Sequence, residues 1–180
     1  MQLTDSREIK ASPEVVWAAI LNPEVLKECV PGCESMTGSV DDGFEAVVAQ
    51  KVGPVSARFT GIVKLSDIEV GRAVTITGEG KGGPAGYAKG GAAVTLEPME
   101  GGTRLSYEVE ASVGGKIAQI GSRLVDMAAQ KMAADFFAAF NAALQERYAI
   151  APPPPPEPKK PLGRRFLDWY LGWLGRIFTG

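Results

Sequence analysis

The sequence contains no histidine, and this absence excludes several kinds of active site. Neither a Ser-His-Asp nor a Cys-His arrangement can be built, and no imidazole is available as a general base or a metal ligand. An enzyme would have to use paired carboxylates, lysine or tyrosine instead. Only Tyr87, Tyr107 and Glu79 suggest themselves for acid and base chemistry, so an enzyme is the least favoured interpretation.

Cysteine is also scarce, because Cys29 and Cys33 are the only two in the chain. A C-x3-C pair without a second pair or any histidine is a poor zinc site. We interpret it as a turn packed with small thiols, rather than as a metal site or a functional disulfide. The opening segment MQLTDSREIK has no apolar signal-peptide core. We therefore expect no bound metal and a reducing, cytoplasmic location.

The formal net charge is only −2, which argues against a general nucleic-acid-binding protein. This small total conceals an asymmetry. Residues 157–180 contain five Lys or Arg and two Asp or Glu, a balance of +3, which leaves −5 for residues 1–156. A basic tail on an acidic body predicts an anionic surface as the partner of the tail.

The middle of the sequence has the periodicity of β-strands. From Val55 to Ser66 apolar and polar residues alternate, as in a strand with one apolar face. Short turn signals such as Gly82-Gly83-Pro84 separate similar stretches and predict an antiparallel meander. Ser12-Pro13-Glu14 and Asn22-Pro23-Glu24 are helix-start signals. The predicted strands cover residues 3–11, 44–52, 55–66, 73–80, 87–96 and 103–113, and the predicted short helices cover 13–20 and 25–29.

From Lys116 the apolar residues recur at steps of three and four, which predicts a helix of about 30 residues, roughly 45 Å long. Its apolar stripe is bulky at Phe136 and Phe140 and slim at Gly121 and Ala128. A one-sided sheet followed by a one-sided helix predicts an α+β fold in which the sheet curls around the helix. Small residues at one end of this contact leave room for a cavity, although they also permit close packing.

Five short motifs follow one another through residues 1 to about 147. They are Ser12–Trp17 (SPEVVW), Val30–Glu34 (VPGCE), Val52–Val55 with Phe59–Gly61, Gly78–Gly82 (GEGKG) and Gly114–Leu124 (GGKIAQIGSRL). In this order they resemble the carbon monoxide dehydrogenase CoxG family (CoxG-like proteins), within the START-like (SRPBCC) helix-grip superfamily.

The resemblance implies a curved antiparallel sheet wrapped around a long C-terminal helix, with a hydrophobic pocket between them. It implies a non-catalytic role beside a carbon monoxide dehydrogenase-type molybdenum hydroxylase, which the protein would link to the membrane. We infer a lipophilic cargo, a respiratory quinone such as menaquinone or ubiquinone, and no covalent cofactor. The alternatives are an assembly or membrane-recruitment factor for that enzyme, and a cyclase of the same superfamily.

The periodicity of the strands and the helix proposes which residues line the implied pocket. For each of them, core packing is an equally good explanation. The Gly78–Gly83 stretch lacks the Gly-Lys-Ser/Thr ending of a phosphate-binding loop, so we interpret it as a flexible lid. Tyr87 would offer a polar handle to a quinone carbonyl. The remaining candidates are Phe59, Gly61, Val63, Leu105, Tyr107 and Val109 from strands and Ile117, Ile120, Gly121, Leu124, Val125 and Ala128 from the helix.

Residues 151–161 read APPPPPEPKKP, which predicts a polyproline spacer of about 34 Å at about 3.1 Å per residue. Residues 162–178 then place apolar and aromatic side chains on one side of a helical wheel and arginines on the other. This segment is too short and too charged to span a bilayer. We expect a helix in the membrane interface, or one that docks in a groove on a partner protein. Its membrane-binding residues would be Arg164, Arg165, Phe166, Trp169, Tyr170, Trp173, Ile177 and Phe178.

The sequence thus predicts three segments. Residues 1–148 would form a helix-grip ligand-binding domain, 149–161 a Pro-rich linker and 162–180 an amphipathic membrane-associating helix. We expect a peripheral protein on the cytoplasmic face of the cell membrane, with no nucleic-acid partner.

Overall fold

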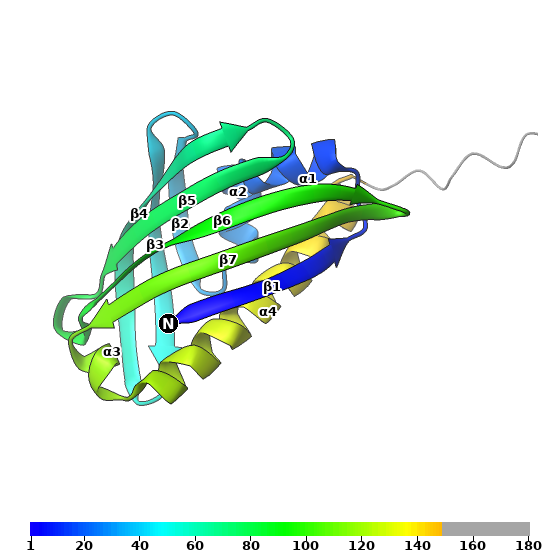
Figure 1. Cartoon of the computed structure of the whole chain (residues 1–180). Coiled ribbons are helices and arrows are strands. Elements are labelled where there is room, and N and C mark those ends of the chain that lie inside the picture. The colour runs from blue at the N-terminus through cyan, green and yellow to red at the C-terminus, as the bar shows by residue number, and fades with distance from the viewer. Residues whose placement is uncertain (149–180) are drawn as a thin grey trace, which may run out of the picture. The chain divides into compact units, whose positions relative to one another are not determined.

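The computed structural model describes residues 1–148, and the predicted linker and tail helix lie outside the described residues. A seven-stranded sheet curves around one long helix, and its strands are ordered β1-β7-β6-β5-β4-β3-β2 (Figure 1). All neighbouring strands are antiparallel. The strands are β1 (Gln2–Ile9), β2 (Cys33–Ser39), β3 (Gly43–Val52), β4 (Val55–Glu69), β5 (Ala73–Lys81), β6 (Tyr87–Met99) and β7 (Gly102–Gly114).

The helices begin where the sequence signals predict. Pro13 stands in the first turn of its helix behind Ser12, and the side chain of Asn22 accepts a hydrogen bond of 2.9 Å from the backbone N–H of Glu24. The helices are α1 (Pro13–Ile20), α2 (Pro23–Cys29), the 3-10 turn η1 (Gly83–Ala85), α3 (Lys116–Gln119) and α4 (Ser122–Arg147). The expected α+β helix-grip arrangement is therefore confirmed.

Two local features differ from the expectation. The edge strand β2 was not predicted, because its sequence CESMTGS is polar and does not alternate cleanly. The single long helix is instead divided between α3 and α4. Gly121 separates them with a backbone φ of +97°, in the left-handed region that interrupts a right-handed helix. The described part of the helical segment is therefore one short helical turn, α3, followed by the long helix α4.

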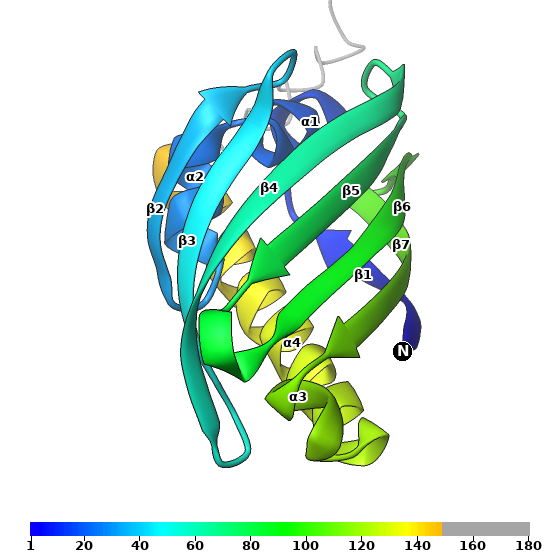
Figure 2. The same ribbon diagram turned by 90° about the vertical axis from the view of Figure 1, so that its left-hand side faces the viewer.

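The meander places successive connections at alternate ends of the sheet. We call the first end the α1 end, which carries α1, α2 and the connections around residues 40–43, 67–72 and 97–104. We call the opposite end the α3 end, made of the connections 51–55, 81–87 and 114–124. Figure 2 shows the β3–β4 turn and α3 together at the lower end, with α1 at the upper one.

The hydrophobic core is concentrated at the α1 end. Ile9, Val16, Val25 and Phe140 are almost fully buried there. The ring of Phe136 stacks on that of Phe140 with centroids 5.6 Å apart. Five further apolar residues are buried but lie outside this core cluster, namely Phe44, Ala46, Ala85, Ile117 and Val125.

Candidate ligand-binding site

The inner face of the sheet, which faces α4, loses side-chain bulk toward the α3 end. The strand register defines its rows. The row beside the core is bulky and packs on it, and consists of Leu3, Leu65, Ile76, Ala92 and Val109. The next row is Phe44, Val63, Gly78, Gly90 and Ala111, and the one after it is Ala46, Gly61, Gly80, Ala88 and Val113. Glycine and alanine therefore replace larger side chains across several neighbouring strands.

The side chains that α4 turns toward the sheet also become smaller toward the α3 end. The C-terminal half of α4 fills the α1 end with aromatic rings, whereas its N-terminal half turns small side chains toward the sheet. At about 100° per residue, Ala129 and Ala133 lie on the same side of α4 as the buried Val125 and Phe140. We call this part of the interior the lean half: the two glycine-rich rows together with Val125, Ala129, Met132 and Ala133.

Phe44, Ala46 and Val125 are buried in the lean half, but most of its other residues are only partly buried. Gly61, Val63 and Ala129 all remain partly exposed, although they lie between the sheet and the helix. Side chains that packed directly against each other would exclude solvent, as they do around Phe140. The lean half is therefore less closely packed than the core around Phe140.

Three elements close over the lean half at the α3 end. The ring of Phe59 lies against Gly82, where an added Cβ would come within 2.4 Å of the ring. Ala85 of η1 and Ile117 of α3 are both buried. At the β3–β4 turn, a Cβ on Gly53 would lie 3.7 Å from a methyl group of Leu124. At Gly53, the β3–β4 turn therefore approaches the helical segment only through the side chains of Leu124 and Ile120.

The structure brings some of the proposed pocket residues together and separates others. Gly61, Val63 and Val125 belong to the lean half, and Phe59, Ile117, Ile120 and Ala128 lie at its margin. Leu105 and Tyr107 belong to the packed core, against which Val109 also packs. Gly121 and Leu124 are exposed on the helical segment.

Tyr87 is not on the inner face. Strand alternation puts it on the outer face of β6, with its ring over Gly114 and its side chain 48% exposed. The expected polar handle for a cargo is therefore absent from that position. The stretch expected as a lid is also largely strand, because residues 78–81 end β5 and only Gly82–Gly86 form the turn.

An inner-face polar pair escaped the sequence analysis. The guanidinium of Arg7 lies 2.6 Å from the carboxylate of Asp5 and 5.9 Å from the centre of the Phe137 ring. Phe137 in turn stacks on Tyr107 with centroids 5.2 Å apart. Alternation within residues 3–9 places Asp5 and Arg7 on the same face as Leu3 and Ile9, and this signal could have identified them.

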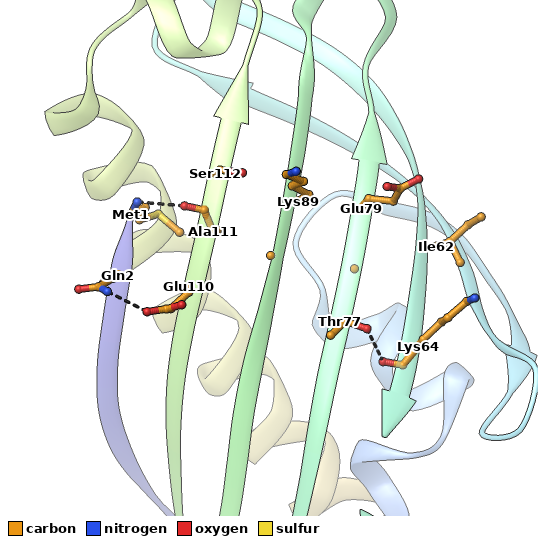
Figure 3. A pocket seen from close by; sticks show the side chains of 12 residues that line it. Met1, Gln2, Ile62, Lys64, Thr77, Glu79, Lys89, Glu110, Ala111 and Ser112 are labelled. Carbon is orange, nitrogen blue, oxygen red and sulfur yellow. Dashed lines mark hydrogen bonds between the residues drawn. The ribbon is translucent and has the colours of Figure 1, made fainter. Parts of the chain in front are cut away.

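An open groove of about 1040 Å³ lies on the outer face of the sheet (Figure 3). Exposed side chains of both charges line it, and Glu79 stands opposite Lys89 in the register. The side-chain amide of Gln2 donates a hydrogen bond of 2.8 Å to Glu110 at its margin. A polar surface open to water would not shield an apolar ligand, so this groove does not replace the lean half as the candidate site.

Neither cysteine has the lowered pKa of a reactive thiol. Burial raises the pKa of Cys29 to about 11 and also raises the pKa of Cys33, so both are protonated near neutral pH. Within residues 1–148, no three His, Cys, Asp or Glu side chains come together as a metal site would require. None of the described helices is long and apolar enough to cross a bilayer.

Comparisons with known proteins agree with this architecture. The family model of the carbon monoxide dehydrogenase component CoxG matches residues 6–145. No curated protein matches the chain. A crystal structure of a conserved protein from Geobacillus kaustophilus is similar, with 28% identity, a TM-score of 0.76 and coverage of 81% of this chain and 96% of that one.

More distant structures share the fold. A protein from Rhizobium leguminosarum is 18% identical with a TM-score of 0.63, covering 81% of this chain and 95% of that one. Ara h 8.0201 is 15% identical with a TM-score of 0.55, covering 81% of this chain and 98% of that one. These likenesses show that the described domain shares the fold of these proteins.

Proposed function

Because the chain belongs to the carbon monoxide dehydrogenase CoxG family, we propose that it is a carrier of a lipophilic molecule, a respiratory quinone, for a carbon monoxide dehydrogenase-type molybdenum hydroxylase. Helix-grip proteins of this kind are generally binding proteins rather than enzymes, which supports a carrier. The quinone would be loaded from the membrane, take up electrons and protons at the hydroxylase and return as quinol.

The observation that carries this proposal is the lean half of the interior. Its residues are glycine, alanine, valine, Phe44 and Met132, whose side chains bind a ligand through apolar contact rather than through directed hydrogen bonds. A polyisoprenoid chain needs such a surface. The Asp5–Arg7 ion pair lies on the same face of the sheet and would contact a polar head group.

Attachment to the membrane is the second part of the proposal. Residues 162–180 would hold the protein at the cytoplasmic face of the membrane, and the proline-rich residues 149–161 would separate them from the domain. A carrier tethered in this way would find its cargo and its partner enzyme within a short distance. The carrier would thus move quinone from the membrane to the hydroxylase.

The direct test is to identify what the protein carries. The full chain would be purified from the membranes of a quinone-containing host, extracted with organic solvent and analysed by mass spectrometry. We expect a quinone in the extract and a rise in the melting temperature when quinone is added to stripped protein. Recovery of no lipophilic molecule, with no change in melting temperature, would overturn the carrier proposal.

A matched pair of variants on α4 tests the location of the cargo. Ala129→Phe places a ring in the lean half, whereas Ala134→Phe places the same ring on the exposed side of the helix. Gly121 is unsuitable for this purpose, because any side chain would be strained at its positive φ. We expect Ala129→Phe to lose the quinone-dependent shift and Ala134→Phe to keep it.

The same pair separates the carrier from a recruitment factor. A recruitment factor needs residues 162–180 but no interior space, so a folded Ala129→Phe variant would still support electron transfer to the membrane. A carrier would lose that transfer while the hydroxylase remained at the membrane. Electron transfer measured in membranes from the variant strain therefore decides between the two functions.

A further inference from the structure

The two ends of the described domain differ sharply in charge. Within the α3 end, segments 51–55, 81–87 and 114–124 contain four exposed cations and no Asp or Glu. The opposite end is dominated by exposed carboxylates in its three sheet connections. The cations are Lys51, Lys81, Lys116 and Arg123, and the carboxylates are Asp41, Asp42, Asp67, Glu69, Glu97 and Glu100, accompanied by Arg72 and Arg104.

Neighbouring carboxylates do not cancel this positive end. Glu34 is held by Arg58 at 2.7 Å, and the exposed Glu79 stands opposite Lys89 in the register, so neither pair contributes net charge. Asp126, in the first turns of α4, is the next carboxylate along the chain and is half-buried. The α3 end is therefore a cationic surface on a domain whose overall charge is negative.

The same end also exposes apolar side chains. Leu124 is 44% exposed and Met127 is 56% exposed on the first turns of α4. Pro54 and Pro84 are exposed at the tips of the two sheet connections beside them. Apolar side chains surrounded by cations are typical of surfaces that enter the head-group region of an anionic bilayer.

We propose that the folded domain itself docks on an anionic lipid bilayer through the α3 end together with Met127. This surface is separate from residues 162–180 and goes beyond the tether in the proposed function. A bilayer suits it better than an acidic protein, because the lean half of the interior lies directly behind this end. A lipophilic cargo leaving there would enter hydrocarbon without crossing water, and the acidic α1 end would point away from the negatively charged lipid.

The orientation is testable with tryptophan fluorescence in the full chain. Trp169→Phe and Trp173→Phe remove the tryptophan fluorescence of residues 162–180 while keeping them apolar, and the remaining Trp17 is buried and common to both reporter variants. In this background Met127→Trp reports on the α3 end. Val70→Trp is the matched control, because Val70 is 84% exposed in the β4–β5 connection at the α1 end.

We expect vesicles of phosphatidylcholine and phosphatidylserine that carry brominated acyl chains to quench Met127→Trp and not Val70→Trp. Equal quenching of both, stronger quenching of Val70→Trp, or no quenching of either would overturn the proposed orientation. The last result would direct attention to an acidic protein as the partner of this end.

Charge reversal tests the energetics. In the full chain with Trp169→Ser and Trp173→Ser, which weaken the tail, Lys116→Glu with Arg123→Glu should reduce binding to phosphatidylserine vesicles by about fivefold or more for each cation removed. Arg72→Glu with Arg104→Glu changes charge equally at the α1 end and should alter binding by less than about twofold. Vesicle flotation measures both, and similar losses in the two variants would overturn the docking surface.

These tests are independent of the cargo. If quinone is absent from the extract but Met127→Trp is selectively quenched, the docking surface stands and the carrier function fails. If quinone is present but the two charge reversals behave alike, the carrier stands and this docking surface fails.

Discussion

The α1 end and the lean half of this domain are built from the same two elements, the sheet and α4, yet their interiors differ. At the α1 end, aromatic rings and α1 and α2 fill the space between sheet and helix, and Phe140 is completely buried. In the lean half, glycine and alanine face each other across the same gap and remain partly exposed. One curved sheet and one helix thus give stability at one end and space at the other.

The largest expected difference between these regions concerns aromatic residues. Phe140→Ala should lower the free energy of unfolding by about 3–5 kcal/mol, because it empties a fully packed site. Phe59→Ala, the same deletion beside the lean half, should cost about half as much or less, because its ring is only partly buried. Urea denaturation followed by circular dichroism measures both. Equal losses would mean that the lean half is packed as tightly as the core.

A buried hydrogen bond contributes to the stability of the α1 end. The hydroxyl of Thr103 donates to the backbone carbonyl of Ala11 at 2.7 Å, and Thr103 is fully buried. Thr103→Ala leaves that carbonyl without its partner, so we expect a loss of about 1–3 kcal/mol in the free energy of unfolding. Thr103→Ser keeps the hydroxyl and should retain most of the stability. A similar loss in both variants would assign the effect to the methyl group.

Two glycines of the inner face test whether the glycine-rich rows are uniformly open. A Cβ on Gly80 would lie 3.8 Å from Phe59, an ordinary contact, whereas a Cβ on Gly90 would lie 2.3 Å from the carbonyl oxygen of Glu110. We expect Gly90→Ala to lower the free energy of unfolding by about 1–3 kcal/mol through overpacking. Gly80→Ala should change it by less than about 1 kcal/mol. Thermal or urea unfolding compares them, and the reverse order would show that the open space lies elsewhere along the strands.

The smallest expected effect is an alkaline loss of stability at the α1 end. Burial raises the pKa of Cys29 from 9.0 to about 11 in the folded protein. Between these values the unfolded chain loses the thiol proton while the folded chain keeps it, so the free energy of unfolding falls as the pH rises from about 9 to about 11. Cys29→Ala should remove this part of the pH dependence. Cys33→Ala is the control, because Cys33 is less buried and should contribute less. Identical pH profiles for wild type and Cys29→Ala would contradict the burial argument.

The fold was largely predictable because its strands are one-sided. Alternation in 55–66 and in 103–113 identifies both a strand and its inner face, and the change of period at Lys116 marks the helical segment. β2 was missed because an edge strand held by backbone pairing needs little apolar alternation. The interruption at Gly121 was missed because a glycine at that position is compatible with either a helix or a break.

The site was less predictable because it depends on small side chains that come together from several strands. Gly78 and Gly80 fall in the predicted strand 73–80, but the glycine run 78–83 was also interpreted as a flexible lid, and a glycine does not show which face of a strand it lies on. Their role becomes visible only when the register places them beside Gly61 and Ala88. Tyr87 could have been assigned to the outer face by counting from Val94, but the start of β6 was not known well enough to count.

The pairing of β1 with β7 has a consequence for how the protein is made. Gln2 stands opposite Glu110, so about one hundred residues must be synthesised after the first strand before its partner exists. At about 5–20 residues per second, this takes roughly 5–20 s. Meanwhile the strands from β2 onward can pair with their immediate neighbours, which is entropically less costly. The segment that leaves the ribosome first is thus among the last to join the sheet, where it forms the edge strand beside β7.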